Sequence, residues 1–211
     1  MIITPSHQYP QIYFGDTSNF ASINLIEMLP ADEIIRSASF KNEKDSSVYI
    51  MSRALLRKLL GPYLKTTPQQ IIISYSSDGK PYLKDYPQIK FNISHSYGAF
   101  AIAISLDYEI GLDIEPQNRK FDYQKLKSFL YSDSELHMGE DMFLKVWTIK
   151  EAIMKAKGIG LTQPLNEIIL SEIVKEKTTL STEIVKNHLV SCYIEGEVES
   201  PHIIYLDGFN N

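Results

Sequence analysis

The sequence predicts an α+β protein made of two halves. Each half contains stretches with apolar residues at helical spacing and short runs of apolar and β-branched residues that are typical of strands. Because strands and helices do not alternate regularly, we expect mainly antiparallel strands and not a parallel α/β sheet. Of the 211 residues, 44% are hydrophobic and 22% are charged. This composition is usual for a globular protein and provides enough apolar residues for a substantial core.

The first half is expected to begin with helices. Thr17-Ser18-Asn19 can cap a helix over Phe20–Leu29, and Pro30 suits the first turn of a helix over Ala31–Ser39. Apolar residues recur at helical spacing through residues 48–59, and Gly61-Pro62 should end this third helix. The expected strands are Gln70–Ser74, Lys90–Ser94 and Ala99–Ser105, with a turn predicted at Asp78-Gly79-Lys80-Pro81.

The second half restarts near Asp107, which we take as the boundary between residues 1–107 and 108–211. A strand is expected over Glu109–Glu115, directly after the boundary. Helices are expected over Tyr123–Tyr131 and Asp141–Lys157, and strands over Ile168–Val174, Leu189–Ile194 and Ile203–Leu206.

Charge and composition exclude several classes of protein. With 21 Lys and Arg against 26 Asp and Glu, the net charge is −5, so no nucleic-acid partner is expected. Apolar runs such as Ala99–Ile104 are too short to span a membrane, and the N-terminus lacks a signal-peptide pattern. Cys192 is the single cysteine and is expected to be a buried hydrophobe. We therefore expect a cytoplasmic protein that does not bind membranes.

Two carboxylates share one face of the strand over Glu109–Glu115. Because strand side chains alternate, Gly111, Asp113 and Glu115 point one way, and the isoleucine and leucine residues between them point the other. Carboxylates that face the same way repel each other unless a cation separates them, and Mg²⁺ prefers such oxygen ligands. Gly111 would clear space beside them. The alternative is an exposed polar strand face.

A second group of charged residues lies on the helix expected over Asp141–Lys157. Trp147, Glu151 and Lys155 are spaced four residues apart and share one stripe, whereas Lys150 points off it. On an isolated helix, Glu151 and Lys155 would simply form an ion pair worth about 0.3–0.5 kcal/mol. Their functional interpretation requires Glu151 to lie beside the carboxylate strand as a metal ligand or a base.

The strand over Lys90–Ser94 ends in a polar segment, Ser94-His95-Ser96. His95 could donate to a phosphate with help from the two serines, or the segment could be a turn with local hydrogen bonds. A hydrolase with a serine nucleophile and His95 as base is a further alternative. Neighbouring strand residues point to opposite faces, so they make a poor nucleophile–base pair.

Taken together, the order and spacing of four motifs resemble the 4′-phosphopantetheinyl transferases. The motifs cover residues 79–161, whereas residues 1–78 match more loosely and residues 162–211 hardly at all. The chain length resembles the surfactin-synthetase-activating type, which implies a monomer with two similar α+β halves related by pseudo-twofold symmetry. The motifs are Gly79-Lys80-Pro81, Phe91-Asn92-Ile93-Ser94-His95-Ser96, Gly111-Leu112-Asp113-Ile114-Glu115, and Trp147-x-x-Lys150-Glu151-Ala152-x-x-Lys155 followed by Gly158-x-Gly160-Leu161.

The resemblance implies a reaction. The 4′-phosphopantetheine arm of coenzyme A would pass to a serine of an apo acyl, peptidyl or polyketide carrier protein, releasing adenosine 3′,5′-bisphosphate. Asp113, Glu115 and Glu151 would hold Mg²⁺ on the pyrophosphate, and Glu151 would also be the base for the serine. His95 and Lys155 would contact the phosphates.

The resemblance also implies that the two halves of the chain bind different parts of coenzyme A. Residues 1–107 would provide the adenine and phosphate side, where Lys80 and Pro81 lie along the adenine and Ser94 assists at the phosphates. Residues 108–211 would provide the metal-binding carboxylates and the catalytic helix. The chain departs from the family at residues 45–48, where a basic stretch for the 3′-phosphate is usual, and Arg36 and Arg53 are the candidate substitutes.

Carrier proteins of this class tend to be acidic, and two parts of the chain suit such a partner. Residues 33–65 carry seven Lys and Arg against three Asp and Glu, a local charge of +4. We expect the carrier protein to dock on the segment between Glu115 and Asp141, which carries Lys125 and Lys127. This segment connects the strand motif that ends at Glu115 to the helix motif that contains Glu151. The alternative for the whole chain is a module that binds coenzyme A or a carrier protein without catalysis.

Overall fold

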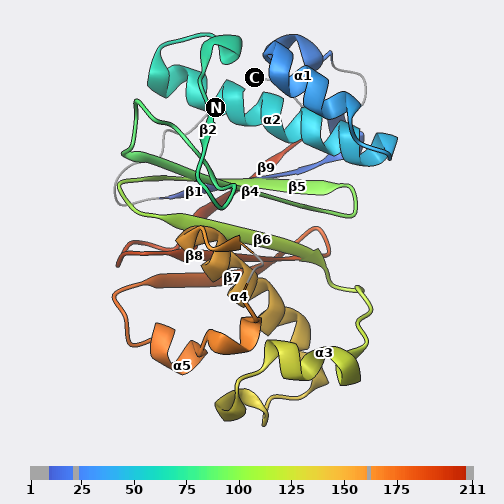
Figure 1. Ribbon diagram of the computed structural model, residues 1–211, viewed down its shortest axis with the longest axis vertical. Helices are drawn as coiled ribbons and strands as arrows, with labels where there is room; N and C mark the ends of the chain where they lie inside the picture. Colours follow the sequence, from blue (N-terminus) through green and yellow to red (C-terminus); the bar gives the residue numbers. More distant parts are fainter. Residues whose placement is uncertain (1–9, 21–23, 161–162, 208–211) are drawn as a thin grey trace.

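The computed structural model describes residues 10–20, 24–160 and 163–207. Figure 1 shows a layered arrangement: helices cover one face of a first sheet, a second sheet packs on its other face, and further helices cover the second sheet. The fold is thus α+β, as predicted. The pseudo-twofold relation between the halves remains a prediction.

The first sheet has four strands in the order β4-β5-β1-β9. Its neighbouring pairs are antiparallel except β1 and β9, which run parallel. Because β9 follows residue 107, the last part of the chain crosses back into the first sheet, and the boundary near Asp107 does not divide the strands into two separate sheets. The strands are β1 (Gln11–Asp16), β4 (Ile89–Ser96), β5 (Ala99–Leu106) and β9 (His202–Leu206).

The second sheet is antiparallel, with three strands in the order β6-β8-β7. A short hairpin of two strands, β2 and β3, holds the predicted turn, in which Gly79 adopts a φ of +82° and Ser76 N–H bonds to the Lys80 carbonyl oxygen. The strands are β6 (Ile110–Pro116), β7 (Thr179–Val185), β8 (His188–Ile194), β2 (Ser74–Tyr75) and β3 (Pro81–Tyr82).

Two long helices, α2 and α4, cover the outer faces of the two sheets (Figure 1). Asn42 caps α2 by accepting from the Lys44 N–H, and Gly158 ends α4 in a left-handed conformation. The α-helices are α1 (Ala31–Ala38), α2 (Glu43–Leu64), α3 (Tyr123–Leu130), α4 (Phe143–Lys157) and α5 (Leu170–Ile173). Described 3₁₀ helices are η1 (Thr17–Phe20), η2 (Ile26–Met28), η3 (Pro68–Gln70), η4 (Asp133–Glu135), η5 (Glu140–Met142) and η7 (Leu165–Glu167).

The core lies between the layers. Side chains of α2 pack on Tyr13, Phe100 and Ile102 of the first sheet, and α4 packs on Tyr193 of the second. Between the sheets, β1 and β5 contact the apolar face of β6 and β8, where Cys192 is buried as predicted. The apolar residues of β6 therefore face the first sheet, and its other face is left for α4.

Several predicted elements are wrong in extent or type. The helix through residues 48–59 does not end at Gly61-Pro62 but continues to Leu64, which is buried, and Lys65 ends it in a left-handed conformation. In place of a helix over Phe20–Leu29, the described residues form the short 3₁₀ helices η1 and η2.

Two predicted strands are also wrong. The stretch Gln70–Ser74 contributes only Ser74 to a strand, because Arg57 Nη1 donates to the carbonyl oxygens of Pro68 and Ile71 and holds this stretch out of a ladder. Ile168–Val174 contains α5 instead of a strand, and its apolar residues pack against the helices beneath the second sheet. Leu161 of the last motif lies outside the described residues.

Candidate active site

The centre of the site is the contact between β6 and α4. A Cβ at Gly111 would overlap the carbonyl oxygen of Ala152, so only glycine lets the α4 backbone approach β6 this closely. Asp113 follows on the same face of β6, and Lys155 Nζ lies 2.6 Å from its Oδ1. Gly111 thus makes room for the helix that carries Lys155, rather than directly for a ligand of the carboxylates.

Side chains of β4 join the two sheets beside this contact. Ser94 Oγ donates to Asp113 Oδ1 at 3.0 Å, accepts from Lys155 Nζ at 3.1 Å and accepts from the Ile114 N–H at 3.3 Å. Asn92 Oδ1 accepts from the Leu112 N–H at 3.1 Å. The polar end of β4 is therefore part of the acidic site, and not only a turn with local hydrogen bonds.

Glu151 lies one helical turn before Lys155, with Oε2 3.9 Å from Lys155 Nζ. Burial, together with the nearby Asp113 charge, raises the pKa of the Glu151 carboxyl to about 7, against the opposing effects of Lys155 and Arg119. One Asp113 oxygen, Oδ2, is buried without a hydrogen-bond partner among the described residues. The structure thus brings Asp113, Glu151 and Lys155 together.

Glu115 faces other partners. Its carboxylate forms an ion pair with Arg119 and accepts from Ser96 Oγ at 2.7 Å. Across residues 10–20, 24–160 and 163–207, the structure brings together no group of three or more His, Cys, Asp or Glu side chains that could hold a metal ion. The three predicted metal ligands are therefore not assembled as one cluster in this arrangement.

His95 points away from Ser94 and lies on the opposite side of β4. It lines a cavity of about 620 Å³ together with residues at the start of α2. Burial and the positive charge of Lys155 lower the pKa of His95, while Asp45 and Asp113 oppose this effect. Because Ser94 and Ser96 bond to carboxylates of β6, the geometry gives no support to a serine nucleophile with His95 as its base.

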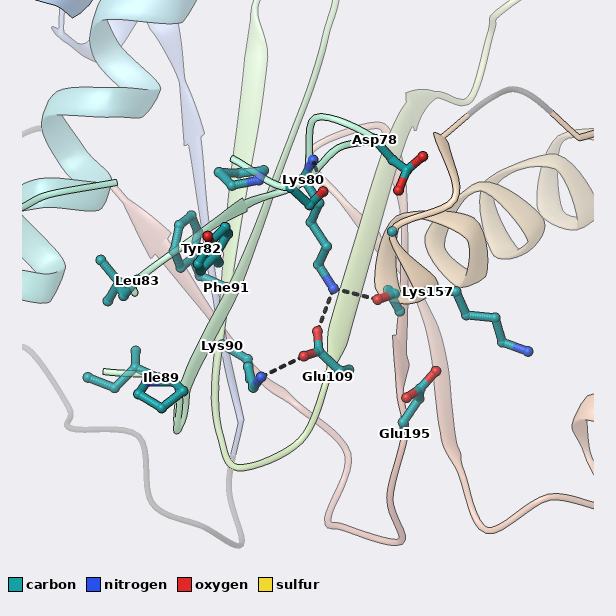
Figure 2. Close-up of a pocket in the computed structure, with 15 residues that line it drawn as sticks. Asp78, Lys80, Tyr82, Leu83, Ile89, Lys90, Phe91, Glu109, Lys157 and Glu195 are labelled. Atoms are coloured by element: carbon teal, nitrogen blue, oxygen red, sulfur yellow. Dashed lines mark hydrogen bonds and ion pairs between the residues drawn. The ribbon is translucent and has the colours of Figure 1, made fainter. Parts of the chain in front are cut away.

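Lys80 and Pro81 line a second cavity, of about 540 Å³, shown in Figure 2. The Lys80 side chain runs across this cavity, and its Nζ donates to the Ala156 carbonyl oxygen and to Glu109 Oε2 at 2.5 Å. Lys90 donates to the other oxygen of Glu109 at 2.6 Å. Bonds from these two lysines lower the pKa of Glu109, although burial alone would raise it.

Arg36 and Arg53 meet at two tyrosine rings. The Cζ atoms of Arg36 and Arg53 lie 5.8 Å and 5.5 Å from the ring centre of Tyr49, and 5.9 Å and 5.7 Å from that of Tyr75. Within the described part of the chain, Arg53 Nη1 is buried and has no hydrogen-bond partner. Tyr75 pairs with Pro81 across the β2–β3 hairpin, so this basic cluster borders the Gly79-Lys80-Pro81 turn.

Lys150 points away from the site, as its place off the stripe predicted. It is completely buried, and its Nζ donates to Glu135 Oε2 at 2.5 Å and to the Leu130 carbonyl oxygen at 2.7 Å. The other oxygen of Glu135 accepts from the Leu170 N–H at 2.9 Å. The two bonds of Lys150 connect α4 to the segment between Glu115 and Asp141, where carrier docking is predicted.

Sequence reasoning missed four residues of the site and the role of a fifth. Arg119 and Glu109 lie just outside the acidic motif, and only a three-dimensional structure shows which partners they reach. Tyr49 and Tyr75 are far apart in sequence, and tyrosines are too frequent in this chain to single out these two. Asn92 lies within a quoted motif, but nothing in the sequence indicates that it bonds to the β6 backbone.

Comparison with known proteins identifies the relatives of this site. Residues 17–106 match the model of the N-terminal region of 4′-phosphopantetheinyl transferases, and residues 109–204 match that of the 4′-phosphopantetheinyl transferase superfamily. The chain is 32% identical to the 4′-phosphopantetheinyl transferase HetI of Nostoc over 170 residues, which are 75% of this chain and 71% of HetI.

Two Bacillus subtilis proteins are also similar. The chain is 28% identical to the 4′-phosphopantetheinyl transferase ffp (81% of this chain, 77% of ffp) and 29% identical to Sfp (74% of this chain, 70% of Sfp). No described helix has the length and apolar character needed to cross a lipid bilayer. The matches to both halves and the identity to HetI show that the chain belongs to the 4′-phosphopantetheinyl transferase family, and that it is of the Sfp-like type.

Proposed function

We propose that the protein transfers the 4′-phosphopantetheine arm of coenzyme A to a serine hydroxyl of an apo carrier protein. The products would be the holo carrier and adenosine 3′,5′-bisphosphate. The observation that carries the proposal is the ion pair of Asp113 with Lys155 where β6 meets α4, with the Glu151 carboxylate beside it. This arrangement places two acidic groups and one basic group together where β6 meets α4, in a chain that belongs to a transferase family.

The chemistry would consist mainly of charge neutralisation. The serine oxygen forms a bond to the phosphorus that carries the pantetheine arm, and the bond from that phosphorus to the bridging oxygen of the pyrophosphate breaks. Negative charge builds up on the phosphate oxygens, so cations held in fixed positions lower the barrier. Lys155 is the cation we propose for this role, with Ser94 holding it in place, and His95 is proposed to donate a hydrogen bond to the phosphates.

The serine must lose its proton as it attacks. We propose Glu151 as the base, because its carboxylate is nearly buried yet has no ion pair closer than the 3.9 Å contact with Lys155 among those the structure describes. A carboxylate in this position would take the serine proton at the moment the new bond forms. Transfer of the proton to Glu151 balances the charge that leaves with adenosine 3′,5′-bisphosphate.

The chemistry of these carboxylates suits a divalent cation with oxygen ligands, although the three do not lie together as one cluster in the described residues. Asp113 Oδ2 is buried without a partner among the described residues, and Asp113 and Glu151 repel each other electrostatically, which a cation would relieve. Glu115 would join them by exchanging its contact with Arg119. Mg²⁺ bound by these carboxylates would neutralise charge on the pyrophosphate.

The nucleotide end of coenzyme A is proposed to lie on the side of residues 1–107. Lys80 and Pro81 would border the adenine, and Arg36 and Arg53 would bind the 3′-phosphate. The buried Arg53 Nη1 without a partner among the described residues supports this assignment, since phosphate would supply the missing acceptor. Residues 108–211 would provide the carboxylates and α4.

The carrier protein is proposed to dock on the segment between Glu115 and Asp141. Lys125 is exposed and pairs only at the surface with Asp122, at 2.8 Å, and Phe129 and Leu136 are exposed apolar residues of the same segment. Such a mixture of cationic and apolar side chains suits an acidic carrier helix. We propose that the protein acts on this partner as a cytoplasmic monomer.

Intact mass spectrometry of carrier proteins tests the proposal. Apo acyl and apo peptidyl carrier proteins are incubated with the protein, coenzyme A and Mg²⁺. We expect a mass gain of one phosphopantetheine on at least one carrier, abolished by a chelator. Binding of coenzyme A by calorimetry without any mass gain would instead indicate a module that binds without catalysis, and would contradict the proposal.

A further inference from the structure

The Lys80 side chain, which comes from residues 1–107, is held by two groups from residues 108–211. It leaves the turn between β2 and β3, crosses the cavity in Figure 2 and ends at the C-terminus of α4. There its Nζ donates to the Ala156 carbonyl oxygen and, at 2.5 Å, to Glu109 Oε2. Only 17% of the Lys80 side chain is exposed. The ammonium group is therefore engaged by the protein before any ligand binds.

The contact with Ala156 has a physical reason. The last carbonyl groups of an α-helix have no partner within the helix, and the C-terminus carries partial negative charge, so a cation that donates there stabilises the helix end. Gly158 ends α4 with a φ of +68°, and a Cβ at this position would lie 3.2 Å from Lys80 Cδ. Glycine thus both ends the helix and leaves room for the lysine side chain.

The contact with Glu109 links Lys80 to β6, the second element of the proposed active site. Glu109 directly precedes β6, the strand that carries Asp113. One Lys80 ammonium group therefore joins the start of β6 to the end of α4, from which Lys155 comes. The distance between the Asp113 and Lys155 side chains depends on how these two elements are placed.

We propose that Lys80 is a positioning residue that fixes α4 against β6 and so aligns Lys155 and Glu151 with Asp113. This inference rests on the proposed function, and it assigns to the lysine ammonium a role apart from coenzyme binding. Any contact of Lys80 with the adenine would come from its backbone. Binding at the Gly79-Lys80-Pro81 turn is thereby coupled mechanically to the catalytic helix.

Lys80→Met tests this inference, with Lys90→Met as the matched control. Both lysines bind Glu109, but Lys90 comes from β4, and its described bond is to Glu109 rather than α4. We expect Lys80→Met to lower kcat at saturating coenzyme A by about tenfold or more, because small misplacements of reacting groups are costly. The KM for coenzyme A should change by less than about threefold, and Lys90→Met should keep kcat at saturating coenzyme A within about twofold of the wild type. Lys80→Arg, which keeps the cation, should restore part of kcat.

A raised KM with an unchanged kcat would overturn the inference, since it would show that the ammonium group contacts the coenzyme. Hydrogen exchange provides a readout that does not need activity. Amides in the last turn of α4 should exchange faster in Lys80→Met and at the wild-type rate in Lys90→Met. Equal exchange in both variants would also overturn it. If the wild-type protein transfers nothing to any carrier, the proposed function fails, while the exchange experiment still decides whether Lys80 holds α4.

Discussion

Asp113 and Lys155 meet where β6 and α4 cross, with Lys155 Nζ 2.6 Å from Asp113 Oδ1. Residues 42 positions apart in the chain are thus brought into a charge-assisted hydrogen bond. The close approach depends on Gly111, because any side chain there would overlap the backbone of α4. Lys155 and Arg119 together place positive charge on the carboxylates that we propose to bind Mg²⁺.

Removal of the Arg119 cation should make the carboxylates bind a divalent metal more tightly. Arg119 pairs with Glu115, and its positive charge also lowers the pKa of Glu151, so it opposes a second cation. We expect Arg119→Gln to lower the Kd for Mn²⁺ by about fivefold or more, measured by electron paramagnetic resonance of free Mn²⁺. Lys120→Gln, at the exposed neighbouring position, is the control. Unchanged or weaker binding in Arg119→Gln would show that Arg119 does not compete with the metal.

The two arginines over Tyr49 and Tyr75 should recognise the 3′-phosphate. We expect Arg36→Ala to raise the KM for coenzyme A about tenfold, the typical cost of one charge-assisted bond to phosphate. The KM for dephospho-coenzyme A, which lacks this phosphate, should stay the same. Lys41→Ala, a nearby exposed lysine, should leave both values unchanged. An equal effect of Arg36→Ala on both substrates would rule out the 3′-phosphate as its partner.

Stability should depend on the buried ion pair between Glu135 and Lys150. Burial alone would raise the pKa of Glu135, but the bonds from Lys150 and from two backbone N–H groups outweigh it and lower the pKa. A lowered pKa in the folded state adds stability above the unfolded pKa, and this stability is lost as the pH falls through the folded value. Lowering the pH should therefore reduce the free energy of unfolding of the wild-type protein, in part through protonation of Glu135.

Glu135→Gln tests that expectation by urea unfolding at neutral and acidic pH. The variant leaves the buried Lys150 without its carboxylate, so we expect a loss of about 3 kcal/mol at pH 7. The contribution of Glu135 to the loss at low pH should disappear. Glu183→Gln, at an exposed position of β7, should keep the wild-type stability at both pH values. A Glu135→Gln variant as stable as the wild type at pH 7 would contradict this account.

Reversing the charge of two lysines on α3 should weaken binding of the carrier protein and leave binding of coenzyme A unchanged. We expect Lys125→Glu with Lys127→Glu to raise the KM for an acidic carrier several-fold, and added salt should reduce the difference from the wild type. Lys175→Glu with Lys177→Glu reverses the same number of exposed charges outside the docking segment and serves as the control. An unchanged KM for the carrier in the α3 variant would place docking elsewhere.

The acidic strand could be predicted from sequence because its signal is local. Alternation alone placed Asp113 and Glu115 on one face of β6, with the apolar residues facing the first sheet. Strand β1 was not predicted, since Gln11 to Gly15 are buried on both faces and show no alternation. Its parallel pairing with β9 depends on residues almost 200 positions apart, which no local pattern records.

The partners of the proposed catalytic groups were harder to predict than the groups themselves. The resemblance pointed to Asp113, Glu151 and Lys155, which the structure brings together, but it gave Lys80 only a role at the adenine. The bond from Lys80 to the end of α4 depends on how the two halves pack. The same is true of Arg119, whose contact with Glu115 follows from the path of the chain after β6.

The central claim is that Asp113, paired with Lys155, forms the catalytic centre. Its most direct test is the initial rate at which the Asp113→Asn variant transfers phosphopantetheine, measured by the intact mass of an apo carrier protein. The substitution keeps the size of the side chain and removes its charge. With Glu183→Gln as the control, we expect the rate to fall by about a hundredfold or more in Asp113→Asn only. A rate within about threefold of the wild type would contradict the claim that this carboxylate, paired with Lys155, forms the catalytic centre.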